Sequence, residues 1–183
     1  MIKTARALHV GPWLRFRIRT GSGHEITVDD EAGNTGPRPA ELLLAALAGC
    51  TAIDVATILT KKRQAVDAYE VIVTGEQRDE PHPHVFERID VVHQLVGPAL
   101  DTAAVRRSIE LSATRYCTAT AMLSAGPVEV HHRYVIHRAG APPEPGEVAV
   151  TGPYANPDAP GSPDEVASTP KTKRHPVREG AHA

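Results

Sequence analysis

Cysteine is scarce in this chain, which has two among its 183 residues. Positive charge is not in excess, since the formal net charge is −2, so neither nucleic acid nor an anionic membrane is indicated as a partner. The N-terminus lacks an apolar run with a cleavage site, and the uncharged run at residues 42–53 is too short to span a bilayer. We therefore expect a cytoplasmic protein, in a reducing compartment where persistent structural disulfides are uncommon.

Sequence motifs for several common chemistries are also missing. The chain has no GlyXSerXGly elbow and no glycine-rich phosphate loop. Ten histidines are present, but His82 and His84 only flank Pro83 in a predicted turn. The adjacent His131 and His132 would point to opposite faces of a strand. Because none of these spacings forms a compact ligand set, we expect no metal site.

The composition changes near residue 140. Nine of the sixteen prolines lie between Gly140 and Ala183, where large apolar side chains are few. Such a segment cannot bury enough surface to offset the entropy cost of ordering it. The sequence therefore predicts one folded domain at residues 1–138 and a disordered tail at residues 139–183.

Hydrophobic periodicity divides the folded part into strands and helices. Strands are predicted at residues 2–10, 14–18, 25–28, 69–77, 85–96 and 128–137. A long helix is predicted from Pro39 to about residue 62, a second from its N-cap Asp101 to about residue 115, and a short third from Cys117. This order predicts an α+β domain with helices packed against an antiparallel sheet.

The long helix carries Cys50. At about 100° per residue, Leu43 and Ile53 share the face of Cys50, while Val55 lies opposite, so the helix is apolar almost all round. Such a helix is normally buried by neighbours on several sides, and Asp54, one turn after Cys50, is expected to line the same cavity. A buried thiol is inert unless a cation lies nearby.

The residues alone leave the roles of the two cysteines open. Cys117 begins a helix, where backbone N–H groups favour a thiolate, which makes it the better nucleophile on physical grounds. Alternatively, both are ordinary buried cysteines with no chemistry.

Two segments together resemble the OsmC/Ohr family of osmotically inducible and organic hydroperoxide resistance proteins. They are GPRPAELLLAALAGCTAID at residues 36–54 and LSATRYC at residues 111–117. The resemblance covers about residues 1–137, and the AlaGlyCysThr form is closer to the less characterised OsmC-like branch. It implies curved antiparallel sheets with a long buried central helix, in an intertwined homodimer.

The same resemblance implies a thiol peroxidase that acts on organic hydroperoxides and, less well, on hydrogen peroxide. Cys50 would be the attacking cysteine and Cys117 the resolving one, which reverses the preference from helix position. A dihydrolipoyl-type dithiol would restore both thiols, and no metal, flavin or haem cofactor would be required. An apolar pocket for the substrate is expected around Cys50, lined by Leu43, Leu47 and Ile53.

In the family, an N-terminal arginine and a glutamate just after the helix-start proline activate the cysteine. Here Ala40 follows Pro39 and the acid comes at Glu41, which on a helix lies about 180° from Cys50. Glu41 is therefore either the catalytic acid or a first-turn acid that favours the helix dipole.

Arg17 is taken as the activating arginine. The alternatives are Arg6, Arg15, Arg19 and Arg38. Two other functions remain open beside the peroxidase: a non-catalytic protein that binds an apolar ligand at the dimer interface, and a slow thiol redox sensor.

Overall fold

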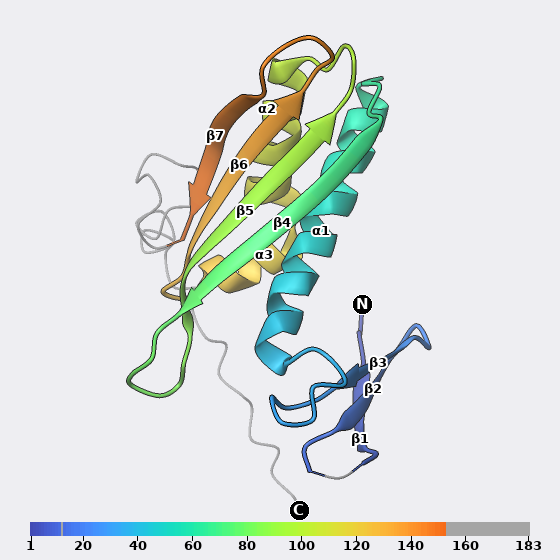
Figure 1. Ribbon diagram of the computed structural model, residues 1–183, viewed down its shortest axis with the longest axis vertical. Helices are drawn as coiled ribbons and strands as arrows, with labels where there is room; N and C mark the ends of the chain where they lie inside the picture. The colour runs from blue at the N-terminus through green and yellow to red at the C-terminus, as the bar shows by residue number, and fades with distance from the viewer. Residues whose placement is uncertain (12, 153–183) are drawn as a thin grey trace, which may run out of the picture.

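The computed structural model describes residues 1–11 and 13–152, which form two β-sheets and three α-helices. A small antiparallel sheet comes first, with the strand order β1-β2-β3. Its strands are β1 (Ala5–His9), β2 (Phe16–Thr20) and β3 (Glu25–Val28). In Figure 1 this sheet lies beside the start of the first helix and away from the larger sheet. All three strands were predicted, β2 from alternating apolar residues and the other two as its neighbours.

The larger sheet has four strands in the order β4-β5-β6-β7, and all three helices cover one of its faces (Figure 1). The strands are β4 (Ala68–Gln77), β5 (Phe86–Val96), β6 (Glu129–His137) and β7 (Glu144–Thr151). Helix α1 (Pro39–Lys61) precedes β4. Between β5 and β6 the chain forms α2 (Thr102–Leu111), a π-helical turn (Ser112–Tyr116) and α3 (Thr118–Ser124).

The expectation of purely antiparallel sheets is wrong at the centre of the larger sheet, where β5 and β6 run parallel. The reason is the connection between them. The helical segment from α2 to α3 carries the chain back to the end at which β5 began, so β6 must run in the same direction as β5. The other pairs in this sheet, β4 with β5 and β6 with β7, are antiparallel.

The predicted domain boundary at residue 138 is also wrong, because β7 extends the sheet through residues 144–151. Proline density had argued against order there. Pro145, however, lies in β7, which is an edge strand of the sheet. An edge strand has no neighbour on its outer side, so the backbone N–H that proline lacks is not needed for a hydrogen bond there. Gly146 lets the ring of Tyr134 pack directly against the β7 backbone. Residues 153–183, the rest of the predicted tail, lie outside the described residues.

Helix α1 buries one narrow stripe in this chain. Its fully buried residues recur every four positions: Leu47, Thr51, Val55 and Leu59. Leu43 and Ile53 remain 49% and 69% exposed, so the predicted cover on several sides is not supplied by a single chain. By length and composition alone α1 is able to cross a membrane, which is weak evidence for a membrane span.

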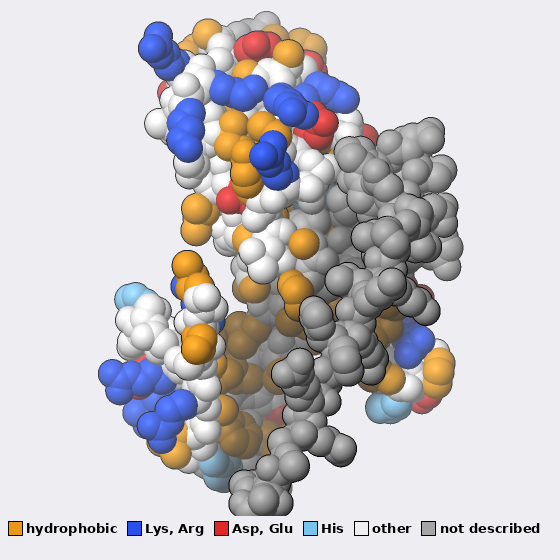
Figure 2. Space-filling view, turned by 180° about the vertical axis from the view of Figure 1, so that it is seen from behind, with side chains coloured by type: hydrophobic (Ala, Val, Ile, Leu, Met, Phe, Trp, Pro, Cys, Tyr) orange, Lys and Arg blue, Asp and Glu red, His pale blue; other side chains and the backbone are white. Residues whose placement is uncertain are grey.

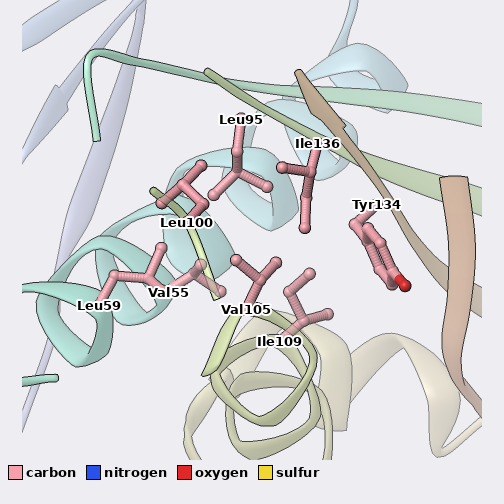
Figure 3. Close-up of a cluster of buried hydrophobic side chains, with 8 residues drawn as sticks. All are labelled: Val55, Leu59, Leu95, Leu100, Val105, Ile109, Tyr134 and Ile136. Atoms are coloured by element: carbon pink, nitrogen blue, oxygen red, sulfur yellow. The ribbon is translucent and has the colours of Figure 1, made fainter. Parts of the chain in front are cut away.

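Two hydrophobic clusters fill the space between the helices and the larger sheet. Figure 3 shows the first, in which Val55 and Leu59 of α1 meet side chains from α2, β5 and β6. The second lies nearer the start of α1 and includes Leu47, Ile89 and Cys117. No residue from β1, β2 or β3 belongs to either cluster in the described part of the chain.

Fully buried polar residues accompany these clusters, and two of them are histidines on neighbouring strands. His93 of β5 and His132 of β6 stack with ring centroids 6.3 Å apart. The Tyr69 hydroxyl lies 2.7 Å from Nδ1 of His93. Burial lowers the pKa of His93 to about 3, and burial together with the charge of His131 lowers that of His132 to about 4. Both rings are therefore neutral near pH 7.

The two histidines predict a loss of stability in acid. The unfolded chain takes up protons at these side chains below a pKa of 6.5, whereas the folded chain does so only near pH 4 and pH 3. The free energy of unfolding should thus fall as the pH drops from about 6.5 toward 4, by several kcal/mol in total. Urea unfolding at a series of pH values measures this slope.

The slope can be assigned with two leucine substitutions. His132→Leu removes a buried titrating ring whose nitrogens have no hydrogen-bond partner among the described residues, so it should flatten the slope. His24→Leu, at an exposed position, should leave it unchanged. An equal slope in the wild type and in His132→Leu would show that His132 is not a source of acid sensitivity.

Candidate functional site

The structure brings Cys50 and Cys117 together, and both are free thiols. Their sulfur atoms and a carboxylate oxygen of Asp54 all lie within 4.8 Å of one another. The three residues come from two separate segments, since Cys50 and Asp54 lie one turn apart on α1 while Cys117 precedes α3. Cys50 and Cys117 are 67 positions apart in the sequence, and they are neighbours because α1 packs against the segment from α2 to α3.

Cys50 lies at the border between the buried stripe of α1 and its exposed side. Leu47, three residues earlier, is fully buried, whereas Ile53, three residues later, is exposed. Cys50 itself is half-buried and packs against the second hydrophobic cluster. Its thiol therefore combines a fixed position with access from outside.

Cys117 is buried and serves as the N-cap of α3, as its place at a helix start predicted. Its sulfur accepts a hydrogen bond from the backbone N–H of Thr120 at 3.3 Å. Burial raises the pKa of the Cys117 thiol, the bonds from Thr120 lower it, and the neighbouring Cys50 raises it again, with burial the largest effect. The helix start therefore does not make Cys117 a thiolate, because desolvation outweighs the capping bonds.

A chain of hydrogen bonds supports Asp54 from inside the core. The Ser112 hydroxyl donates to Oδ2 of Asp54 at 3.1 Å. Since that proton is engaged, the Thr51 hydroxyl donates to Oγ of Ser112, 3.0 Å away. Asp54 was expected in the cavity of Cys50, but Ser112 and Thr51 were missed. Thr51 carried a signal, since a polar residue on the buried stripe of a helix needs a buried partner.

Glu41 lies at the first turn of α1, about 14 Å along the helix axis from Cys50. It is exposed and accepts a hydrogen bond from the backbone N–H of Arg38 at 2.9 Å. The Arg38 guanidinium also lies 3.7 Å from Glu41. Within one chain Glu41 therefore acts as a helix-start acid.

The N-terminal arginines lie in or beside the three-stranded sheet. Arg17 is exposed on β2. Arg15 is paired with the buried Asp29 at 3.3 Å, and Arg19 with Glu25 at 4.0 Å. Among the described residues, no cation contributes to the pKa shift of Cys117. Within residues 1–11 and 13–152, no arginine is thus found to act on the Cys117 thiol, and the role of Arg17 stays a prediction.

The three residues expected to line a substrate pocket do not share one environment. Leu47 is buried beside Cys117, whereas Leu43 and Ile53 face outward. One cavity, of about 370 Å³, lies on the larger sheet, and neither cysteine lines it. Its lining residues are Ala68, Tyr69, Glu70, Gln94, Val96 and His137.

In the part of the chain that the structure describes, two groups of side chains could hold a metal ion, which the sequence spacings did not indicate. One is the thiol site itself, with Cys50, Asp54 and Cys117. The other is exposed in the turn between β4 and β5 and combines Glu80, His82 and His84. Sulfur ligands would favour a soft cation at the first group, and imidazoles a transition metal at the second.

Known proteins are similar to this chain in sequence and in fold. The family model described as OsmC-like protein matches residues 32–133. Protein YhfA of Escherichia coli is 41% identical over 123 residues, which cover 67% of this chain and 90% of YhfA. The crystal structure of a hypothetical protein from Aquifex aeolicus is 27% identical, with a TM-score of 0.65, over 75% of this chain and 99% of that one.

A more distant solved structure has the same fold. It is the organic hydroperoxide resistance protein OhrB of Bacillus subtilis, 17% identical with a TM-score of 0.51, covering 73% of this chain and 98% of OhrB. This likeness concerns the fold alone. The resemblance of the two cysteine segments is thereby confirmed, and so is the α+β fold. The chain belongs to the OsmC-like protein family.

Proposed function

We propose that the chain is a cysteine-dependent peroxidase that reduces organic hydroperoxides and, less well, hydrogen peroxide. The observation that carries this proposal is the meeting of two free thiols, Cys50 and Cys117, whose sulfurs lie within 4.8 Å. The family membership supports it, because a protein of this fold is named for organic hydroperoxide resistance.

The exposure of the two thiols favours a division of labour. Half-buried Cys50 can meet a peroxide, whereas buried Cys117 cannot. The Cys50 thiolate attacks the O–O bond and takes up the terminal OH group, which makes it a sulfenic acid. The alkoxide that departs takes a proton from solvent and leaves as the alcohol. Cys117 then displaces the hydroxyl as water and forms a disulfide. An external dithiol of the dihydrolipoyl type restores both thiols by exchange, without a metal, flavin or haem.

The working form is a homodimer, and it acts in a reducing, cytoplasmic compartment. The dimer is supported by the exposed side of α1, where Leu43 and Ile53 leave apolar surface uncovered. Figure 2 shows hydrophobic side chains in the recess between the three-stranded sheet and the rest of the molecule. A second copy packed on this side would bury Ile53 and close the apolar pocket over Cys50.

The same dimer would also bring an arginine close to Cys50, where its positive charge would favour the thiolate. The three-stranded sheet belongs to neither hydrophobic cluster of its own chain, so it is available to pack on a second copy. Arg17, exposed on β2, would then approach the Cys50 of that copy and favour its thiolate. Glu41, at the start of α1, would orient the guanidinium.

A slow redox sensor is the second candidate. The observation in its favour is the burial of Cys117, which raises the pKa of that thiol, while no cation among the described residues lowers it. A protein with such thiols would still form the disulfide, but it would not turn over rapidly. The third candidate is a non-catalytic protein that binds an apolar ligand. Its support is the same exposed face of α1, with Leu43 and Ile53.

Peroxide turnover tests the peroxidase. With cumene hydroperoxide and dihydrolipoamide, the wild type should turn over steadily, and Cys50→Ser should lower the rate at least about a thousandfold because it removes the nucleophile. Cys117→Ser should complete one round and then inactivate by over-oxidation. Equal rates for the wild type and Cys50→Ser would refute the proposal, and slow wild-type turnover with full disulfide formation would favour the sensor.

Association of two copies is tested by Ile53→Asp, since a charge buried in an apolar interface is strongly unfavourable. We expect the dimer dissociation constant to rise at least about thirtyfold, equivalent to about 2 kcal/mol. Ile72→Asp, at an exposed position of β4, is the matched control and should leave it unchanged. Analytical ultracentrifugation measures both, and a monomeric wild type at micromolar concentration would contradict the dimer.

A further inference from the structure

Asp54 is the acidic side chain that the structure places beside both thiols. One of its carboxylate oxygens lies within 4.8 Å of Cys50 Sγ and of Cys117 Sγ. It is half-buried, and its charge acts on the half-buried Tyr69, because burial and then Asp54 raise the pKa of that hydroxyl. Peroxide reduction as proposed above assigns this carboxylate no task.

Ser112 ties the position of Asp54 to that of Cys117. Its hydroxyl holds Oδ2 of Asp54, and its carbonyl oxygen accepts the backbone N–H of Cys117 at 2.9 Å. The second bond closes the π-helical turn, a widened turn that is frequent at functional sites. The Thr51 hydroxyl fixes Ser112 from α1. The carboxylate and the resolving thiol are thus held by one residue.

The resolving thiol needs a proton acceptor. Cys117 is 3% exposed, so bulk water does not reach it, and burial raises the pKa of its thiol, which keeps the proton on sulfur. The attack on a sulfenic acid requires the thiolate, and the hydroxide that leaves Cys50 requires a proton. A single proton-carrying group close to both sulfurs meets both needs.

We propose that Asp54 is a catalytic residue of the resolving step, in which it carries the proton of the Cys117 thiol to the hydroxide that leaves Cys50. This inference rests on the proposed function, because it needs a sulfenic acid at Cys50. The Cys117 S–H bond and the Cys50 S–O bond break, and the S–S bond forms. Cys117 sulfur is oxidised, Cys50 sulfur is reduced, water leaves, and Asp54 ends as the carboxylate it was.

Single-turnover kinetics of Asp54→Asn test this role, with a chelator present to exclude metal from the thiols. Reduced protein is mixed with cumene hydroperoxide, and the sulfenic acid and the disulfide are followed separately by chemical trapping and by mass. Sulfenic acid should form at the wild-type rate or faster, because a neighbouring negative charge is gone. Disulfide closure should slow by about 10² to 10³-fold, the usual contribution of a positioned acid–base group.

The pH profile separates a proton carrier from a structural role. In Asp54→Asn, closure should recover as the pH rises, because hydroxide then removes the Cys117 proton. Asp67→Asn removes an exposed charge elsewhere and should change neither step. Closure in Asp54→Asn within about threefold of the wild type, or equally slow at every pH, would overturn the proposal, since a positioned base contributes far more.

Failure of the peroxidase proposal gives a different result. A wild type that forms no sulfenic acid refutes peroxide reduction, and closure of the dithiol by diamide then tests Asp54 without peroxide. Ser112→Ala, which keeps the carboxylate but releases it, should slow closure by about three- to tenfold, in line with a lost hydrogen bond of roughly 1 kcal/mol. Ser108→Ala is its control, since that hydroxyl donates to the carbonyl oxygen of Ala104 in its own helix.

Discussion

The buried hydrogen bond between Thr51 and Ser112 joins the two segments on which the whole site depends. It lies in the contact between α1 and the helical segment that returns from β5 to β6. Breaking this bond would leave a buried hydroxyl unpaired, which costs free energy. The bond therefore fixes the position of α1 along the segment from α2 to α3. That register sets Cys50 opposite Cys117 and Asp54 against Ser112. The sheet and the two hydrophobic clusters serve to hold this register in place.

Burial and access divide the site between its two sides. The inner side holds Cys117 and the hydroxyl chain, where desolvation keeps the thiol protonated. The outer side holds Cys50 on an apolar helix face that a single chain leaves open. The inner side is thus suited to resolve an intermediate and the outer side to receive a substrate. A second copy would complete the outer side with apolar cover and a cation.

Local patterns predicted most of the fold. The predicted strands at residues 25–28 and 85–96 match β3 and β5 nearly to the residue, and Pro39 and Asp101 marked the starts of α1 and α2. The errors concern the direction and the existence of strands that depend on contacts between distant segments. The direction of β6 follows from a helical crossover, and β7 forms despite its prolines because an edge strand tolerates Pro145.

The sequence predicted that the two cysteines, whose family-like segments implied a pair, lie together with Asp54, which follows Cys50 by one turn, and this proximity is confirmed. The catalytic roles of Cys50 and Cys117 stay predictions. The sequence could not predict Ser112, because the partner of a buried hydroxyl depends on packing between distant segments. It could not place Arg17 either, because one chain leaves the three-stranded sheet outside both clusters.

The central claim is that Cys50 and Cys117 act as one redox couple, and peptide mapping tests it most directly. Reduced protein is treated with one equivalent of cumene hydroperoxide, blocked with iodoacetamide and digested. The account predicts a disulfide-linked peptide pair containing Cys50 and Cys117, in the same amount as the alcohol formed. Recovery of both cysteines as alkylated, unlinked peptides, with the peroxide unconsumed, would contradict it.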